Sequence, residues 1–491
     1  MMEELFSWVL ERKDYEKLQL NDYFYSRPEI IVPVKTIMKD LDWSRYRVLS
    51  TYELLSNDIK QLEPTAKHAF NYDDELKAVV VDHDVRLDRQ MLQRRYLDAS
   101  IVWQYLGEVV DESIASLEDF AQRHLTSIPV VRAAKQIVDE HLAQLNLRIS
   151  KDNRVIGSET TIRSFYFGIV RSVKGLLMIS ATSDRFDQQV DQIFRKVTQK
   201  LSGRMRQTNI LKLKLTISIW FLRIRKNNFA TAEDVTYVFD DKNPIDEDDF
   251  HQAILDVVAE LIENENMRKV EARFLTAAIY ATGVVPGNHA RVFDEETQQV
   301  LKGMNDSLKQ SYQEFFKVAL TTTQAGELDD MLFATHLSVL FFPYARFVAR
   351  KNHQIKVDSL PVQSIFAEFA MQRIISDHGL PLKVAEAGLF NDYLVNFTYL
   401  IPTELLPVVN VVFDFADNHG MAKLLYQRIG NIQGVNINIC DYLSDQTDIY
   451  VSDQILTWNQ EVPAFLWNEL PSDYAFSQFL KRVVEITRDQ L

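Results

Sequence analysis

The sequence predicts a mainly α-helical, multidomain protein. Its 491 residues are too many for one hydrophobic core, because single cores stop growing at about 250–300 residues. Only 14 Gly and 13 Pro interrupt the chain, and Leu, Ala, Glu, Gln and Arg recur at helical spacing over most of its length. Strand patterns are local: they occur near residues 78–82, at 145–156 and after residue 401.

The composition argues against a membrane-spanning protein and against a disulfide-rich protein. The hydrophobic fraction of 46% and the charged fraction of 25% are those of a globular protein, and no apolar run reaches the length of a membrane span. The N-terminus is acidic where a signal peptide would be basic, so we expect a cytoplasmic protein without a membrane partner. The single cysteine, Cys440, allows no disulfide framework, and the ten histidines show no metal-ligand spacing. We therefore expect no metal, no cofactor and no enzymatic activity.

Residues 116–156 have the pattern of a helix-turn-helix followed by a wing. Ser116 stands three residues before Asp119, as at a capped helix start, so a short helix is expected at 116–124. Ser127 is expected to cap a second helix that runs to about residue 144. A hairpin should follow over 145–156.

The second helix and the wing carry the side chains that would contact DNA. Arg and Gln read base edges and Lys holds phosphate, so polar positions of this helix are candidate readers. The predicted contacts are Ser127, Arg132, Lys135 and Gln136 on the helix, with Arg148, Lys151 and Arg154 on the wing. The alternative is that two short amphipathic helices with a polar turn imitate the pattern. Because the net charge is −15, affinity for DNA must come from individually placed cations.

The first 62 residues suggest another helix-turn-helix. Helices are expected at 15–25, from Pro33 onward, and from a cap at Ser44 to about residue 62. The exposed contacts predicted on the third helix are Arg45, Arg47, Ser50 and Thr51. A plain three-helix bundle explains this segment almost as well. A hairpin of 77–82 with 85–87 and one long helix at 88–110 should then lead to the second motif.

Beyond the wing, two helical bundles are expected. Cations predominate at 166–230 and anions at 231–300, which would neutralise each other within one domain; the alternative is a basic face turned toward DNA or an acidic partner. A weak repeat relates residues 221–228 to 347–353. The last segment alternates strands and helices: strands at 408–415, 435–439, 449–451 and 463–466 and helices at 419–429 and 473–487 predict a small α/β layer with a parallel sheet.

This arrangement resembles the Mga/AtxA family of Gram-positive virulence transcriptional regulators. The specific marks are IGSETTIRSFYF after the wing and the tail segments VVFDF and DIYVSD. The resemblance implies five domains: a first helix-turn-helix (1–62), a second, winged, Mga-type one (63–165), two bundles similar to phosphotransferase regulatory domains (166–285 and 286–400), and a domain similar to the EIIB component of sugar phosphotransferase systems (401–491).

In such bundles, phosphorylation of histidines by phosphocarrier proteins tunes activity. His336 stands where the resemblance places one histidine, whereas Ala278 and Thr398 stand at two other positions and residues 142–250 hold none. His251 is a second candidate, and a hydrogen-bonded core histidine explains His336 equally well. The EIIB-like domain lacks a cysteine after its first strand, which predicts a binding or dimerisation module.

The sequence thus predicts a transcriptional activator that binds double-stranded promoter DNA and dimerises through its C-terminal half. The resemblance further implies that its degenerate regulatory bundles sense carbohydrate status through phosphocarrier proteins. Two alternatives are a phosphotransfer or sugar-uptake regulatory protein that acts through protein contacts, and an RNA-binding antiterminator. Antiterminators of this kind begin with a β-rich RNA module, and this N-terminus is helical.

Overall fold

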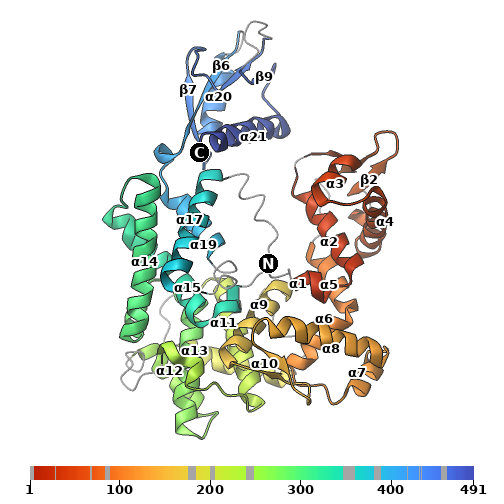
Figure 1. Ribbon diagram of the computed structural model, residues 1–491, viewed down its shortest axis with the longest axis vertical. Helices are drawn as coiled ribbons and strands as arrows, with labels where there is room; N and C mark the ends of the chain where they lie inside the picture. The colour runs from red at the N-terminus through yellow and green to blue at the C-terminus, as the bar shows by residue number, and fades with distance from the viewer. Residues whose placement is uncertain are drawn as a thin grey trace.

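The computed structural model describes residues 5–27, 29–66, 69–82, 89–174, 184–199, 205–238, 248–346, 360–380, 389–416, 419–430, 432, 434–454 and 462–491. The protein is mainly helical, as predicted, and has a small C-terminal sheet (Figure 1). No helix in these ranges is long and apolar enough to cross a membrane.

The N-terminal unit combines helices with a small antiparallel sheet. Its elements are α1 (Leu5–Val9), α2 (Arg12–Tyr25), β1 (Ile31–Pro33), α3 (Val34–Leu41), α4 (Arg45–Leu62), β2 (Phe70–Asp73) and β3 (Ala78–Val81). The three expected helices are confirmed, and the Ser44 side chain caps α4 by accepting a hydrogen bond from the Arg47 amide. The sheet order is β1-β3-β2, with both pairs antiparallel.

One expectation for this region was wrong and another is not covered by the structure. The strand at 78–81 is present as β3, with β1 and β2 on its two hydrogen-bonding edges, whereas residues 85–87 of the expected hairpin lie outside the described residues. The expected long helix is two helices, α5 (Arg89–Ala99) and α6 (Ile101–Val110). Ser100 breaks it, since its hydroxyl caps α6 at the Trp103 amide and also donates to the Val9 carbonyl.

The second motif follows as α7 (Leu117–Arg123), α8 (Ile128–Ala143), β4 (Arg148–Ile149) and β5 (Val155–Ile156). The next helix, α9 (Glu159–Lys174), crosses the expected domain boundary at residue 165. It packs against the first bundle, which contains α10 (Asp184–Thr198), α11 (Gln207–Arg225), α12 (Asp249–Ala259) and α13 (Glu265–Ala281).

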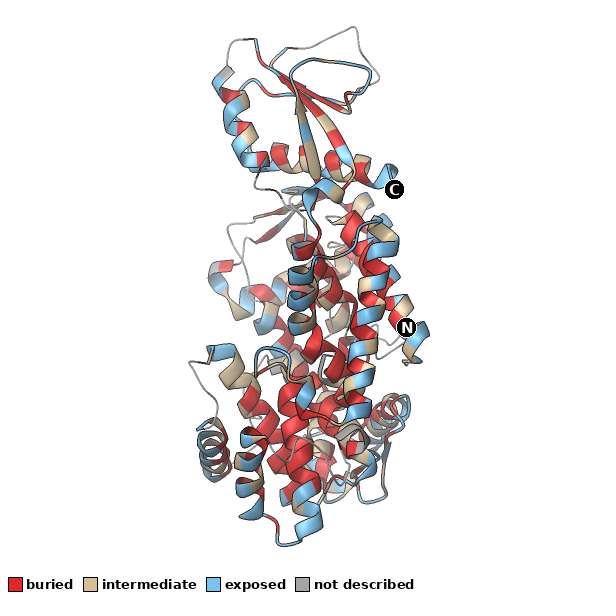
Figure 2. Cartoon of the chain, turned by 90° about the vertical axis from the view of Figure 1, so that its left-hand side faces the viewer, coloured by how far each residue is buried: buried red, intermediate tan, exposed pale blue. Residues whose placement is uncertain are grey.

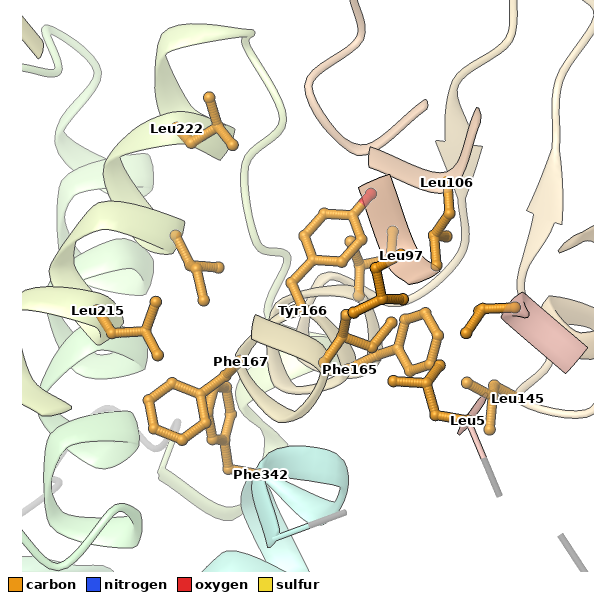
Figure 3. Close-up of a cluster of buried hydrophobic side chains, with 14 of the residues drawn as sticks. Leu5, Leu97, Leu106, Leu145, Phe165, Tyr166, Phe167, Leu215, Leu222 and Phe342 are labelled. Carbon is orange, nitrogen blue, oxygen red and sulfur yellow. The ribbon is translucent and has the colours of Figure 1, made fainter. Parts of the chain in front are cut away.

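Helix α9 joins the N-terminal motifs to the first bundle through a shared core. One continuous buried cluster runs from Leu5 to Phe342. In Figure 3, Phe165 points toward Leu5 and the other N-terminal leucines, whereas Phe167 points toward Phe342, 5.8 Å away between ring centroids. Burying each such ring stabilises the joint by about 1.5–3 kcal/mol.

The second bundle contains α14 (Glu295–Phe316), α15 (Thr322–Phe341), α17 (Pro361–His378) and α19 (Phe390–Leu400). Helix α15 belongs to both bundles, because Phe333 and Leu337 join the first core while Leu328 and Leu332 join the second. Figure 2 shows the buried residues along the inner sides of these helices. The predicted repeat segment 347–353 lies outside the described residues.

The C-terminal segment has the parallel sheet that its pattern predicted, and it also has a buried core of its own. Its elements are β6 (Val408–Asp414), α20 (His419–Ile429), β7 (Asn436–Cys440), β8 (Ile449–Ser452), β9 (Ala464–Leu466) and α21 (Asp473–Asp489). The four strands are all parallel, in the order β7-β6-β8-β9. The buried residues of α20 and α21 pack with Val409, Val411 and Phe413, which share one face of β6.

Candidate nucleic-acid interface

The turn between α7 and α8 is fixed by caps and by the backbone. The Ser116 hydroxyl accepts a hydrogen bond from the Asp119 amide at 3.1 Å, as predicted. Leu125 takes a left-handed conformation with φ of 50°, and the Thr126 amide donates to the Ala121 carbonyl at 2.9 Å. Ser127 occupies the N-cap position of α8, but its side chain makes no capping hydrogen bond, so this part of the prediction was wrong. Ser127 is exposed, as a DNA contact at the start of α8 must be.

Helix α8 buries one face and exposes the other. Val131, Ala134, Val138 and Leu142 are buried, and Ile137 is half-buried. Because a helix that follows such a turn enters the major groove in helix-turn-helix proteins, the exposed face of α8 is the candidate reading surface.

Lys135 and Asp139, which are both half-buried, hold the wing against α8. The Lys135 ammonium donates to the Asn153 side-chain oxygen at 3.0 Å, and the Tyr105 hydroxyl donates to the same oxygen at 3.2 Å. The Asp139 carboxylate accepts from the Ile149 amide at 2.9 Å. Lys135, predicted as a DNA contact, is thus already bonded to the hairpin in this conformation.

The other residues of this motif that were predicted to contact DNA are exposed, but some of them already interact with neighbouring side chains. Gln136 donates to Glu140 one turn along α8 at 2.9 Å. Arg154 approaches the Glu112 carboxylate at 3.6 Å. Arg132, Arg148 and Lys151 make no side-chain hydrogen bond or ion pair with any other described residue. These three cations are the charges that the motif can offer to DNA.

The second motif and the helices on either side of it match a known protein family. Residues 85–169 fit the family model of the Mga helix-turn-helix domain. After this match, residues 85–169 are called the Mga domain. No curated protein matches the chain. The match supports the resemblance to the Mga/AtxA family and indicates a DNA-binding transcriptional regulator.

The Mga domain is anchored by Glu108, which sequence reasoning missed. Its carboxylate accepts two hydrogen bonds from the Arg123 guanidinium, at 2.7 and 2.6 Å, and one from His124 Nε2 at 2.6 Å. Burial by itself raises the pKa of Glu108, but Arg123 and His124 outweigh burial and hold that pKa below its usual range. Glu108 lies on α6, so its bonds fix the end of α7 against the preceding helix.

Glu108→Gln is expected to destabilise the Mga domain near neutral pH by about 1 kcal/mol. A carboxylate whose pKa is lowered by folding contributes stability above its unfolded pKa of about 4.3, and that contribution is lost as the pH falls through the folded pKa. Thermal unfolding of the full chain between pH 3.5 and 7 should therefore show a difference between wild type and variant that shrinks on acidification. Glu118→Gln, an exposed change on α7, is the control; a constant difference at every pH would contradict this role for Glu108.

A buried ion network connects the Mga domain to the first bundle. Arg163 of α9 is only 1% exposed; its guanidinium binds Glu271 of α13 at 2.8 and 2.9 Å and Glu159 at 2.9 Å. Burial by itself lowers the pKa of Arg163, but the two carboxylates outweigh it and raise that pKa, so the guanidinium stays charged. Trp220 of α11 donates to Glu271 at 2.8 Å.

The network continues from α9 to the wing. Arg223 of α11 binds Glu159 at 2.5 Å and Glu112 at 3.0 Å, and the Asn228 side chain donates to Glu112 at 2.6 Å. Glu112 is also the carboxylate next to Arg154 of the wing. Glu112 lies between α6 and α7 and has a positive φ of 48°.

The first motif offers fewer contacts than the sequence predicted. Arg45 is exposed at the start of α4. Arg47 is half-buried: it binds Glu16 at 2.7 Å and lies over the Trp43 ring at 4.4 Å. The Ser50 hydroxyl is half-buried and donates to the Arg47 carbonyl at 3.3 Å, and Thr51 is 4% exposed. The prediction that Arg47, Ser50 and Thr51 are exposed contacts was therefore wrong.

Sequence reasoning also missed other cations of the first motif. Lys35 and Lys39 are exposed on α3, and Lys77 is exposed beside β3. Lys35 and Lys39 are four residues apart on one helix face, which is the signal that could have found them.

Both candidate phosphorylation histidines are buried. His251 is 1% exposed and lies 2.8 Å from the Thr276 hydroxyl. His336 is also 1% exposed, and its Nε2 lies 2.9 Å from the Tyr393 hydroxyl. His336 also lines a cavity of about 490 Å³ between α14 and α15. A phosphocarrier protein does not reach either ring in this conformation.

Proposed function

We propose that this chain is a transcriptional activator that reads promoter DNA through the Mga domain. The observation that carries the proposal is the pairing of an exposed recognition helix with a wing, which together present Arg132, Arg148 and Lys151 without internal partners among the described residues. Arg suits guanine edges, and the two wing cations suit the phosphate backbone. The first motif, with Arg45, Lys35 and Lys39, adds a second and weaker contact.

The test is a gel shift and footprint of the full chain on promoter fragments at two salt concentrations. Each neutralised phosphate contributes a slope of about −0.9 to the dependence of log affinity on log salt, so a slope of about −2 to −3 for each Mga domain is expected. Failure to bind any promoter fragment above competitor DNA would refute the proposal. A transcription assay with the bound promoter separates activation from repression.

The active form in this proposal is a homodimer made through the C-terminal half. A parallel sheet is normally covered on both faces, and the helices α20 and α21 pack with only one face of β6. On the other face, Val412 and Tyr450 are buried, but Asn410, Asn438 and Cys440 toward the β7 edge are exposed or half-buried, and Tyr442 just beyond β7 is 83% exposed. Light scattering of the full chain should report a dimer that Asn438→Arg together with Tyr442→Asp dissociates. A dimer that withstands these changes would place the interface elsewhere.

We also propose that the protein senses carbohydrate status through phosphocarrier proteins. Among the two candidates, His336 is the better supported, because it lines a cavity whereas His251 is enclosed between α12 and α13. Modification of His336 would require α14 and α15 to separate. Incubation with phosphocarrier protein that already carries a radioactive phosphoryl group should label the wild type and His251→Ala but not His336→Ala; equal labelling of all three would exclude His336.

A further inference from the structure

The exposed surface of α8 is largely apolar at the positions that approach DNA. We define the reading face as Pro129, Val130, Arg132, Ala133 and Gln136, all of which are exposed. Val130 is 45% exposed although its neighbour Val131 is fully buried. Three of the five side chains are thus hydrocarbon. These three lie on the first two turns of the helix, where recognition helices contact base edges.

Few polar groups on the reading face are free to read bases. Gln136 is bonded to Glu140, and Lys135 at the edge of the face is bonded to Asn153 of the wing. Among these described residues, Arg132 is left as the free hydrogen-bonding side chain of the reading face, and the exposed Ser127 hydroxyl at the N-cap adds one short polar group. Hydrogen bonds alone would therefore give this helix very little base discrimination.

The major groove presents one apolar group, the C5 methyl of thymine. A pyrrolidine ring, an isopropyl group and a methyl group can contact thymine methyls and exclude water from them. These apolar groups cannot form hydrogen bonds with the polar edges of guanine or cytosine. Those edges would lose their hydrogen bonds to water if hydrocarbon covered them. Glu140, further along the same exposed surface, also disfavours close approach of phosphates.

We propose that Pro129, Val130 and Ala133 read thymine methyl groups in the major groove. This inference rests on the proposed function, since it assigns the base chemistry of that same DNA site. Arg132 then fixes the register by one polar contact, while the methyl contacts select thymine-containing steps around it.

The experiment replaces every thymine of a bound promoter fragment by deoxyuridine, which keeps all hydrogen-bonding groups and removes only the methyls. The full chain is measured by fluorescence anisotropy on both fragments. Each lost methyl contact should weaken binding by about fourfold, so two or three contacts give a preference of more than about tenfold for the thymine fragment. The double variant Val130→Ser/Ala133→Ser should lose most of that preference, whereas Leu261→Ser, an exposed change in the first bundle, should retain it.

The outcomes separate this inference from the function on which it rests. Equal affinity of the wild type for thymine and deoxyuridine fragments would overturn methyl readout and leave DNA binding intact. A preference that persists in the double variant would assign the discrimination to DNA shape or to another element, and would also overturn it. Binding to neither fragment would remove the proposed function itself.

Discussion

Replacing Arg132, Arg148 and Lys151 together by alanine is expected to weaken promoter binding by about 100- to 1,000-fold at physiological salt. Loss of the base contact of Arg132 should reduce discrimination between promoter and competitor DNA. Loss of the two wing cations should weaken binding to all sequences alike and make the salt slope shallower by about 2. Fluorescence anisotropy over a series of salt concentrations measures both effects.

The matched control removes three other positive charges. Lys269, Arg291 and Lys302 are exposed on the bundles, and their replacement by alanine changes the net charge equally. If this control weakened DNA binding as much as the first triple variant, general electrostatics and not the placed cations would hold the DNA. Light scattering of both variants should show an unchanged oligomeric state.

Arg163→Met is expected to cost about 3–5 kcal/mol of stability. Methionine fills similar space but leaves the Glu159 and Glu271 carboxylates buried with one cation fewer. The ion network joins α9, α11 and α13, so the first bundle and the joint to the Mga domain should loosen together. Urea unfolding followed by tryptophan fluorescence measures the loss, because Trp220 is bonded to Glu271 within the network.

An exposed ion pair provides the control for Arg163. Lys196 and Glu260 lie 2.5 Å apart with both side chains about half exposed, and Lys196→Ala should cost less than about 1 kcal/mol. A cost for Arg163→Met no larger than for Lys196→Ala would show that the buried network adds little to stability. The Arg163→Met protein should also bind DNA less tightly, because Glu112 connects the network to Arg154 of the wing.

The helix-turn-helix and the C-terminal sheet were predictable because their signals are local. Ser116 and Asp119 form a cap within four residues, and the apolar strand at 408–414 needs no distant partner to be recognised. Hydrophobic periodicity and turn residues indicate whether a segment locally favours a helix, a strand or a turn, and the folded chain keeps that local structure. The break at Ser100 was missed although its cap on the Trp103 amide is local, and the second bond of its hydroxyl goes to a carbonyl far along the chain, that of Val9.

Which polar residues are free to bind DNA could not be predicted from their type. Arg132 and Lys135 are alike in the sequence, yet one is unpaired among the described residues and the other holds Asn153 of the wing. Arg47 and Arg45 are equally suitable by residue type, but Glu16 of a separate helix neutralises Arg47. The pattern along one helix shows which of its faces is polar. It does not show which residues of other helices pack against that face.

The sequence by itself determined a mainly helical chain with a Mga helix-turn-helix domain and a separate parallel C-terminal sheet, because caps, turns and periodicity are set within a few residues. The tertiary structure alone decided that one core joins Leu5 to Phe342 and that Arg163 and Arg223 couple the Mga domain to the first bundle. The physical reason is distance along the chain. Glu271 lies 108 residues from Arg163, so only folding brings the two charges together. Once both are buried, each charge needs the other because water no longer solvates it.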